Sequence, residues 1–181
     1  MTPDPAMRER TIALVGLMGV GKSTIGRKLA QTLDLPFRDA DTEIEKAAGR
    51  SISDIFAERG EEEFRAGERR VIARMIEESP HVLATGGGAF MNEETRALIK
   101  DKAVSVWLKA DLEVLVRRVS RKDTRPLLVG RDPRKVLKQL MTDRYPVYAM
   151  ADIAIETDDR PANAAVEAII AALAERLERE S

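Results

Sequence analysis

Cysteine is absent from this sequence of 181 residues, and aromatic side chains are scarce, with four Phe, two Tyr and one Trp. The absence of cysteine excludes disulfides, thiolate zinc sites and a thiol nucleophile, and it favours a cytoplasmic protein. Lys and Arg number 30 against 31 Asp and Glu, which leaves a formal net charge of -1. A chain with so few stacking rings and no excess of positive charge is not expected to bind nucleic acid.

Long hydrophobic runs are also missing. The longest apolar stretch, 162–173, is interrupted by Asn163 and Glu167 and is shorter than the ~20 residues that span a bilayer. Residues 1–10 are polar and lack the apolar core of a secretory signal. We therefore expect a soluble protein without membrane contact, with a loose N-terminal tail at 1–10 and a single domain at 11–181.

Short β-branched or aliphatic runs alternate with longer helical patterns along the chain, and the first helical pattern covers 23–33. Strands separated by helices predict an α/β fold with a parallel sheet. The five runs that read as strands lie at 11–15, 35–38, 81–84, 103–108 and 153–155.

Three patterns mark helix starts further along the chain. Ser51 with Asp54 resembles a capping box, Asp111 can cap the next helix, and Asp132 precedes a proline at the first helical position. The most loop-like interior stretch is 121–131, which mixes charges with a proline and a glycine. We predict that this stretch is a mobile lid.

A phosphate-binding loop follows the first predicted strand. Residues 16–23 fit the pattern G-x-x-x-x-G-K-[ST] and lead directly into the first predicted helix. Glycines allow backbone N–H groups to point at phosphate oxygens, Lys22 is expected to contact the β and γ phosphates, and Ser23 to ligate Mg²⁺. The alternative, a glycine-rich turn with a chance lysine, explains the strand and helix on either side less well.

Two acidic residues, Asp39 and Asp41, follow the second predicted strand. The carboxyl ends of the strands are where open α/β sheets bind ligands, so both should lie near the phosphate loop. One carboxylate can hold the Mg²⁺ shell, and the other, for which we choose Asp41, can take the proton of an acceptor hydroxyl. The alternative is that both cap the helix that begins near Thr42. The only histidine, His81, opens a strand and is expected to be structural.

The motifs taken together resemble the shikimate kinases, a family with a nucleoside-monophosphate-kinase-like P-loop fold. The resemblance runs from about Thr11 to the last helix and implies a three-layer α/β/α fold with a five-stranded parallel sheet. The motifs that carry it are the phosphate loop, the Asp39–Asp41 pair, Gly60-Glu61-x-x-Phe64-Arg65, the triple glycine 86–88 and Arg125-Pro126-Leu127 in the predicted lid.

The resemblance implies ATP and shikimate as substrates, Mg²⁺ as the cofactor and a monomeric enzyme that makes shikimate 3-phosphate. It gives catalytic roles to Lys22, Asp41 and Arg125, and Mg²⁺ contacts to Ser23 and Asp39. The implied nucleotide contacts are Gly19, Val20, Gly21, Lys22, Ser23, Thr24, Arg118, Arg125 and Arg160, and the implied shikimate contacts are Asp41, Arg65, Gly87, Gly88 and Arg144.

Some of these residues could have other roles. Phe56 and Phe64 could wall the acceptor pocket or simply pack in the core, and Arg118 could belong to a solvated basic face. Arg160 is followed directly by a proline, where the family usually spaces the two residues, so the register of this loop stays open.

Two departures from the family pattern follow Arg144. Val147 replaces a usual leucine, and Met150 stands where an acid is common. Two other functions remain as alternatives: a kinase for another small acid such as gluconate, and a nucleotide-sensing module without turnover.

Overall fold

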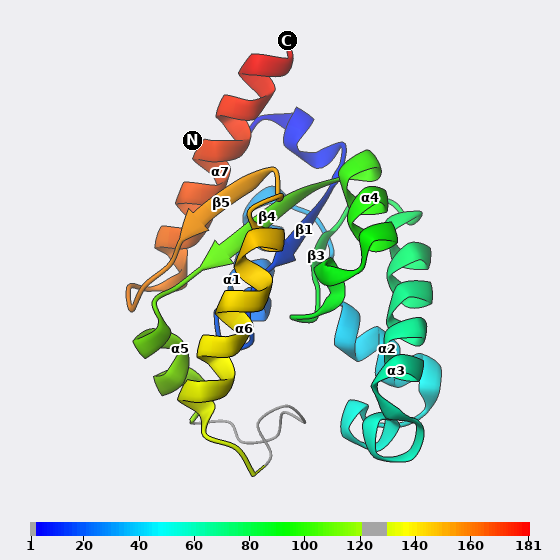
Figure 1. Ribbon diagram of the computed structural model, residues 1–181. Coiled ribbons are helices and arrows are strands. Elements are labelled where there is room, and N and C mark those ends of the chain that lie inside the picture. The colour runs from blue at the N-terminus through cyan, green and yellow to red at the C-terminus, as the bar shows by residue number, and fades with distance from the viewer. Residues whose placement is uncertain (1–2, 121–129) are drawn as a thin grey trace.

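A parallel sheet of five strands, in the order β2-β3-β1-β4-β5, organises the computed structural model, which describes residues 3–120 and 130–181 (Figure 1). The central strand β1 is buried along its whole length and pairs with β3 on one side and β4 on the other. The strands are β1 (Thr11–Val15), β2 (Phe37–Asp39), β3 (Val82–Ala84), β4 (Ala103–Lys109) and β5 (Ile153–Glu156).

The predicted strands are confirmed, with shifted ends. The largest shift is in β2, which was predicted at 35–38 and begins at Phe37. Pro36 has no N–H to donate, and only its carbonyl joins the ladder, accepting from the Val82 amide at 2.9 Å. Strand β2 therefore begins at Phe37, directly after the proline, and continues to Asp39.

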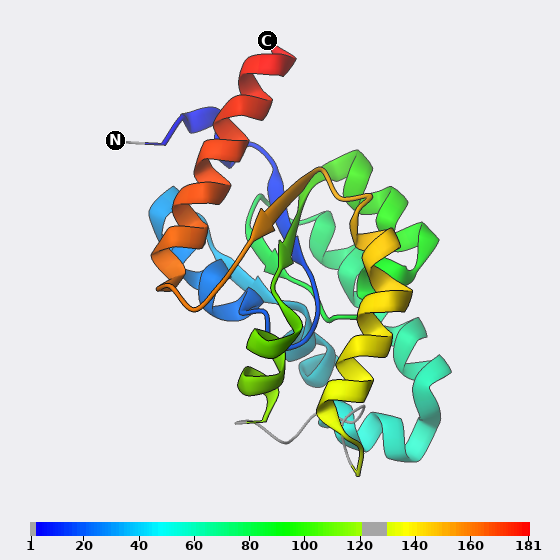
Figure 2. The same ribbon diagram turned by 60° about the vertical axis from the view of Figure 1, so that its left-hand side comes forward.

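Helices cover both faces of the sheet, which confirms the three-layer arrangement. Helices α1 and α7 lie together on one face, while α3, α4 and α6 lie on the other (Figure 2). No helix within residues 3–120 and 130–181 is long and apolar enough to cross a membrane. The helices are α1 (Lys22–Leu33), α2 (Ala40–Ala48), α3 (Ile52–Ile76), α4 (Glu93–Lys102), α5 (Leu112–Val119), α6 (Pro133–Tyr148) and α7 (Ala162–Glu180), with short 3-10 helices η1 (Pro5–Arg8) and η2 (Ala89–Met91).

Two of the three predicted helix caps are confirmed. The Ser51 hydroxyl accepts from the Asp54 amide at 3.1 Å, and Asp132 accepts from the Arg134 amide at 3.1 Å, with Pro133 as the first helical residue. Asp111 occupies the N-cap position of α5, but its side chain accepts no capping hydrogen bond, so that prediction is wrong. The negative charge of Asp111 still lies at the positive end of the helix dipole.

The prediction of a loose tail at 1–10 is wrong for the part that the structure describes. Residues Pro5–Arg8 form η1, whose N-terminus is capped by the side chain of Asp4. Met7 is only 6% exposed and belongs to the core, and η1 contacts α7. Besides Met7, Arg10 ties this segment to the rest of the chain by donating to the carbonyl of Asp101 at 2.8 Å.

The predicted lid falls largely outside the described residues. Residues 121–129, including Arg125, are not described, and the chain is described again from Gly130 and Arg131 into α6.

Candidate active site

The phosphate loop joins β1 to α1 at the carboxyl edge of the sheet. Gly19 and Gly21 have φ angles of 83° and 101°, a region that non-glycine residues rarely adopt. Because α1 begins at Lys22, the loop ends at the amino end of a helix, where unpaired N–H groups and the helix dipole favour a phosphate. Lys22 Nζ donates to the carbonyl oxygens of Gly16 at 2.5 Å and Leu17 at 3.3 Å, which holds the ammonium over the loop.

A cavity of about 530 Å³ opens above this loop. Its walls come from the phosphate loop, from the ends of β2 and β3, and from the segment between β5 and α7. Every described residue that was predicted to contact nucleotide lies on it, namely Gly19, Val20, Gly21, Lys22, Ser23, Thr24, Arg118 and Arg160. The structure therefore brings these residues together around one cavity, and their contact with a nucleotide stays a prediction.

Arg118 links the two rims of this cavity. Its guanidinium donates to the carbonyls of Gly19 at 3.3 Å and Val20 at 3.0 Å, and to the carbonyl of Asp158 at 2.8 Å. A side chain held by three backbone carbonyls does not belong to a solvated basic face, so that alternative is wrong. Arg160 instead pairs with the exposed side chain of Asp158 at the outer rim.

Asp39 and Ser23 meet between the phosphate loop and α2. Ser23 Oγ donates to Asp39 Oδ2 at 2.8 Å, while Asp39 Oδ1 accepts from the amides of Asp41 at 2.9 Å and Thr42 at 3.3 Å. The capping alternative therefore holds for one oxygen of Asp39, and the other oxygen faces the phosphate loop. A hydroxyl and a carboxylate side by side are oxygen ligands of the kind that Mg²⁺ accepts.

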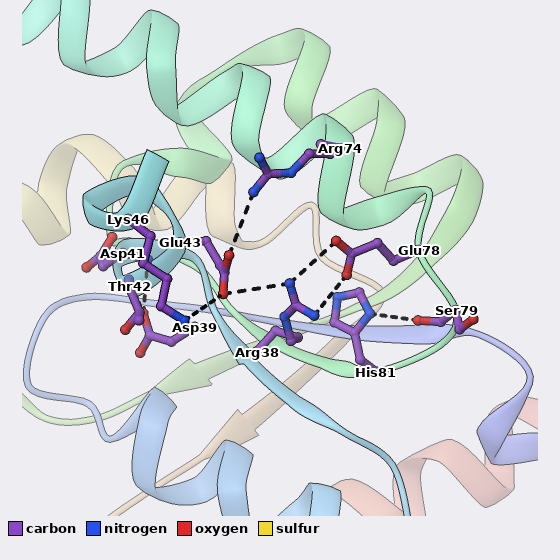
Figure 3. A network of polar contacts seen from close by, with 10 residues as sticks. All are labelled: Arg38, Asp39, Asp41, Thr42, Glu43, Lys46, Arg74, Glu78, Ser79 and His81. Atoms are coloured by element: carbon purple, nitrogen blue, oxygen red, sulfur yellow. Dashed lines mark hydrogen bonds and ion pairs between the residues drawn. The ribbon is translucent and has the colours of Figure 1, made fainter. Parts of the chain in front are cut away.

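Helix α2 is braced where it carries Asp41. Glu43 lies 3.7 Å from each of Arg38, Lys46 and Arg74, and Arg38 also reaches Glu78 at 3.2 Å. These ion pairs join β2, α2 and α3 beside the Asp39–Asp41 turn (Figure 3). Their partial exposure makes each pair weak, and together they orient α2.

Asp41 lines both this cavity and a neighbouring one. Burial, and after it the negative charge of Asp39, raise the pKa of Asp41 to about 6 against the opposing effect of Lys22. A carboxylate with a pKa near neutrality is suited to take up a proton during a reaction.

The second cavity, of about 130 Å³, shares Met18, Asp41, Gly86 and Gly87 with the first. Arg65 from α3 and Arg144 from α6 lie on it, and Arg144 is only 8% exposed. The predicted acceptor residues therefore come together from four different parts of the chain.

The triple glycine 86–88 forms the floor of the second cavity, and each glycine faces a different side chain. A Cβ on Gly86 would stand 3.0 Å from Asp41 Oδ1, and one on Gly87 would stand 3.0 Å from Arg144 Nη1. A Cβ on Gly88 would overlap the guanidinium of Arg65, at 2.6 Å from its Nη1. Charged ends of side chains lie against the backbone here, so a side chain at any of these positions would have to displace them.

Glu68 was not predicted from the sequence. It is 3% exposed, lies on the second cavity, and accepts from Arg65 Nη1 at 2.9 Å through Oε1. Burial raises the pKa of Glu68, although Arg65 opposes this. The signal in the sequence was its spacing three residues after Arg65 on one helix. Glu61, the acidic residue of the motif that contains Arg65, lies 3.6 Å from the Arg65 guanidinium and is far more exposed than Glu68.

Gly60 bends α3 next to this cavity. Its φ of 82° and ψ of 171° break the helix, and a Cβ there would meet nothing within 4 Å. Gly60 is therefore needed for its conformation rather than for space. Phe56 and Phe64 lie on either side of the bend with ring centroids 4.7 Å apart. Both line the second cavity, and Phe64 is also in the core, so both readings of this pair hold.

His81 is structural, as predicted. It is 1% exposed, its Nδ1 lies 2.9 Å from the carbonyl of Ser79 (Figure 3), and it lines neither cavity. The exposed side chain of Met150, at 63%, also lies on neither cavity.

Comparisons with known proteins agree on one family. The family model described as shikimate kinase matches residues 18–174. A shikimate kinase of Caulobacter vibrioides is 69% identical over 167 residues, which cover 92% of this chain and 84% of that protein. A shikimate kinase of Brucella canis is 53% identical over 171 residues, which cover 94% of this chain and 86% of that protein.

A solved structure of shikimate kinase from Acinetobacter baumannii, in complex with shikimate, is also similar. It superimposes with a TM-score of 0.90 at 35% sequence identity, covering 96% of this chain and 98% of that one.

Proposed function

This chain belongs to the shikimate kinase family, and we propose that it transfers the γ-phosphoryl group of ATP to the 3-hydroxyl of shikimate, giving shikimate 3-phosphate and ADP. The observation that carries the proposal is the pair of cavities that meet at Asp41. One has a phosphate loop as its floor, and the other ends in two arginines suited to a carboxylate. A ligand in each would place a hydroxyl and a phosphoryl group on either side of Asp41.

Arg65 and Arg144 bind the carboxylate of shikimate in this proposal. A planar guanidinium matches a carboxylate with two parallel hydrogen bonds, and the low exposure of Arg144 strengthens its interaction. Glu68 holds the Arg65 guanidinium through one nitrogen. The backbone N–H groups of Gly87 and Gly88 supply further donors at the floor of the cavity.

Asp41 orients the acceptor hydroxyl and takes its proton as the new P–O bond forms. Lys22 leaves its loop carbonyls to contact the β and γ phosphates and stabilises the charge that develops on them. The rate enhancement comes chiefly from alignment and charge stabilisation, as in other phosphoryl transfers.

Mg²⁺ would be held by Ser23 Oγ and, directly or through water, by Asp39 Oδ2, which already face one another at 2.8 Å. When bound, the ion neutralises negative charge on the phosphates. The second oxygen of Asp39 stays bonded to the start of α2, which keeps the carboxylate in place.

At the far end of the first cavity, Arg118 and Arg160 contact the adenine half of ATP in this proposal. Arg125, which lies outside the described residues, is the residue that closes over the phosphates. We further propose that the chain acts as a cytoplasmic monomer with a single domain that includes η1, in the route to chorismate and aromatic amino acids.

The identity of the product tests this function. The protein is incubated with Mg-ATP and shikimate, and the product is examined by mass spectrometry and by phosphorus–proton coupling in NMR. We expect one added phosphate, coupled to the proton on carbon 3. Gluconate, a small acid with several hydroxyls, serves as the control acceptor and should give no product; phosphorylation of gluconate in place of shikimate would refute the proposal.

A further inference from the structure

Tyr148 is a buried residue that no step of the proposed reaction uses. It ends α6, is fully buried, and packs against Trp107 and Tyr145, with ring centroids 5.9 Å and 6.2 Å away. Its hydroxyl donates a hydrogen bond to the carbonyl oxygen of Gly87. This bond joins two parts of the chain 61 residues apart.

The carbonyls of the triple glycine are held in two different ways. Gly86 accepts from the Ala89 amide and Gly88 from the Met91 amide, each at 3.2 Å, so the two outer carbonyls are held by local turns. The hydrogen bond that the structure shows on the middle carbonyl comes from Tyr148. Glycine backbones are conformationally permissive, so a fixed direction for this peptide needs a constraint from outside the turn.

A peptide plane transmits that constraint. The Gly87 carbonyl and the Gly88 amide belong to one planar unit, so holding the oxygen also sets the direction of the N–H on the opposite side. Gly87 and Gly88 line the second cavity, whereas Tyr148 lies behind them. The Tyr148 hydroxyl therefore acts on the cavity without touching what binds there.

Tyr148 also touches the other side of the acceptor pocket. Arg144 lies one helical turn earlier on α6, and it hydrogen-bonds to the Tyr148 hydroxyl, which lowers a pKa that burial otherwise raises. One hydroxyl thus connects the arginine that faces Gly87 with the carbonyl of Gly87 itself.

We propose that Tyr148 is a positioning residue that orients the Gly87–Gly88 peptide and the Arg144 guanidinium for binding of the acceptor. The inference rests on the proposed function, because the acceptor is taken to be shikimate. Tyr148 contacts no reacting atom, and its effect appears in acceptor binding rather than in nucleotide binding.

Tyr145 provides a matched control on the same helix. Its ring lies 4.9 Å from that of Trp107, and its hydroxyl donates to a backbone carbonyl, that of Ala110, at 3.2 Å. Tyr145→Phe and Tyr148→Phe remove the same atom from the same aromatic cluster. Only Tyr148→Phe removes a bond to the glycine turn.

The experiment compares initial rates of the wild type and both variants, with shikimate and Mg-ATP varied in turn. For Tyr148→Phe we expect the KM for shikimate to rise about tenfold, as the loss of one buried hydrogen bond predicts, and the KM for ATP to change less than about twofold. Tyr145→Phe should leave both values within about twofold. An unchanged shikimate KM in Tyr148→Phe, or an equal rise in Tyr145→Phe, would overturn the proposal.

A second readout does not depend on the acceptor. In protein labelled with ¹⁵N-glycine, Tyr148→Phe should shift or broaden the amide signals of Gly87 and Gly88, and Tyr145→Phe should leave them in place. Unmoved signals in Tyr148→Phe would show that the hydroxyl does not hold the turn. If the wild type did not use shikimate, the acceptor role would fail with the proposed function, while this spectrum would still decide whether Tyr148 orders the turn.

Discussion

At the scale of single residues, the raised pKa of Asp41 predicts the pH dependence of the reaction. Its pKa is raised to about 6 by burial and by Asp39, and the proposed base must be ionised to accept a proton. We expect kcat/KM for shikimate to rise with pH up to about 6 and to level off above it. Asp41→Asn should lower kcat by about 10²- to 10⁴-fold and remove this limb. As a control, Glu62→Gln removes an exposed carboxylate and should keep the pH profile of the wild type. If kcat/KM of Asp41→Asn still rose with pH up to about 6, that rise would belong to another group.

The same shift predicts that Asp41 lowers stability at neutral pH. Its folded pKa lies above its unfolded value, 3.8, so the native state binds the proton more tightly and stability falls as pH rises from about 3.8 to about 6. A difference of about 2 pH units is equivalent to at most about 3 kcal/mol. Asp41→Asn should therefore be more stable than the wild type at pH 7.5. The difference in stability between the two proteins should become smaller towards pH 4.5. Thermal unfolding at the two pH values measures this, and a gap that widens at low pH would contradict it.

The ion pair between Arg65 and Glu68 allows the effect of Arg65 on stability to be measured separately from its effect on shikimate binding. Glu68 is buried and forms an ion pair with Arg65 at 2.9 Å, so Arg65→Ala should cost about 3 kcal/mol of stability by leaving the buried carboxylate without that partner. It should also raise the KM for shikimate about 100-fold. In the double variant Arg65→Ala/Glu68→Gln, denaturant unfolding should show most of the stability restored while the KM stays high. If stability and the KM for shikimate both returned to the values of the wild type, Arg65 would have only a structural role. Arg70→Ala, at an exposed position on the same helix, is the control.

At the scale of elements, a glycine in a helix and a glycine in the turn at the second cavity should respond to alanine in opposite ways. A Cβ on Gly88 would overlap the Arg65 guanidinium, which is the end of a flexible side chain and can move away. Gly88→Ala should therefore cost little stability and raise the KM for shikimate about tenfold. Gly67 lies within α3, and a Cβ there would come no closer than 3.8 Å to Arg70. Gly67→Ala should stabilise the protein by up to about 1 kcal/mol with unchanged kinetics, because alanine favours a helix. Thermal unfolding and initial rates decide both; a loss of stability in Gly67→Ala would contradict the argument.

Elements were predictable from the sequence where local chemistry decides them. The phosphate loop, the Asp39–Asp41 turn and the caps at Ser51 and Asp132 depend on residues within a few positions of one another. The failure at the N-terminus depends on a distant partner, because η1, with Met7 in the core, packs against α7. The failure at Asp111 is local, because the residue has the position of a cap but its side chain accepts no capping hydrogen bond.

At the scale of the whole molecule, parallel topology made the site predictable. Strands β1, β2 and β3 end at one edge of the sheet, so the segments that follow them meet there although they are far apart in sequence. That argument brought together the phosphate loop and Asp41, whereas the place of the triple glycine in the site was implied by the family resemblance. Glu68 and Tyr148 could not be found in this way, because their importance comes from burial and from contacts that only the folded chain displays.

The most direct test of the central claim is the release of ADP from Mg-ATP, measured with and without shikimate. We expect ADP release by the wild type to depend on shikimate and to be lost in Asp41→Asn. In Arg65→Ala/Glu68→Gln, release should be slow at low shikimate concentrations and should recover at high ones. Folded, ATP-binding protein that released ADP at the same rate with and without shikimate would contradict the assignment of the two cavities to a phosphoryl donor and its acceptor.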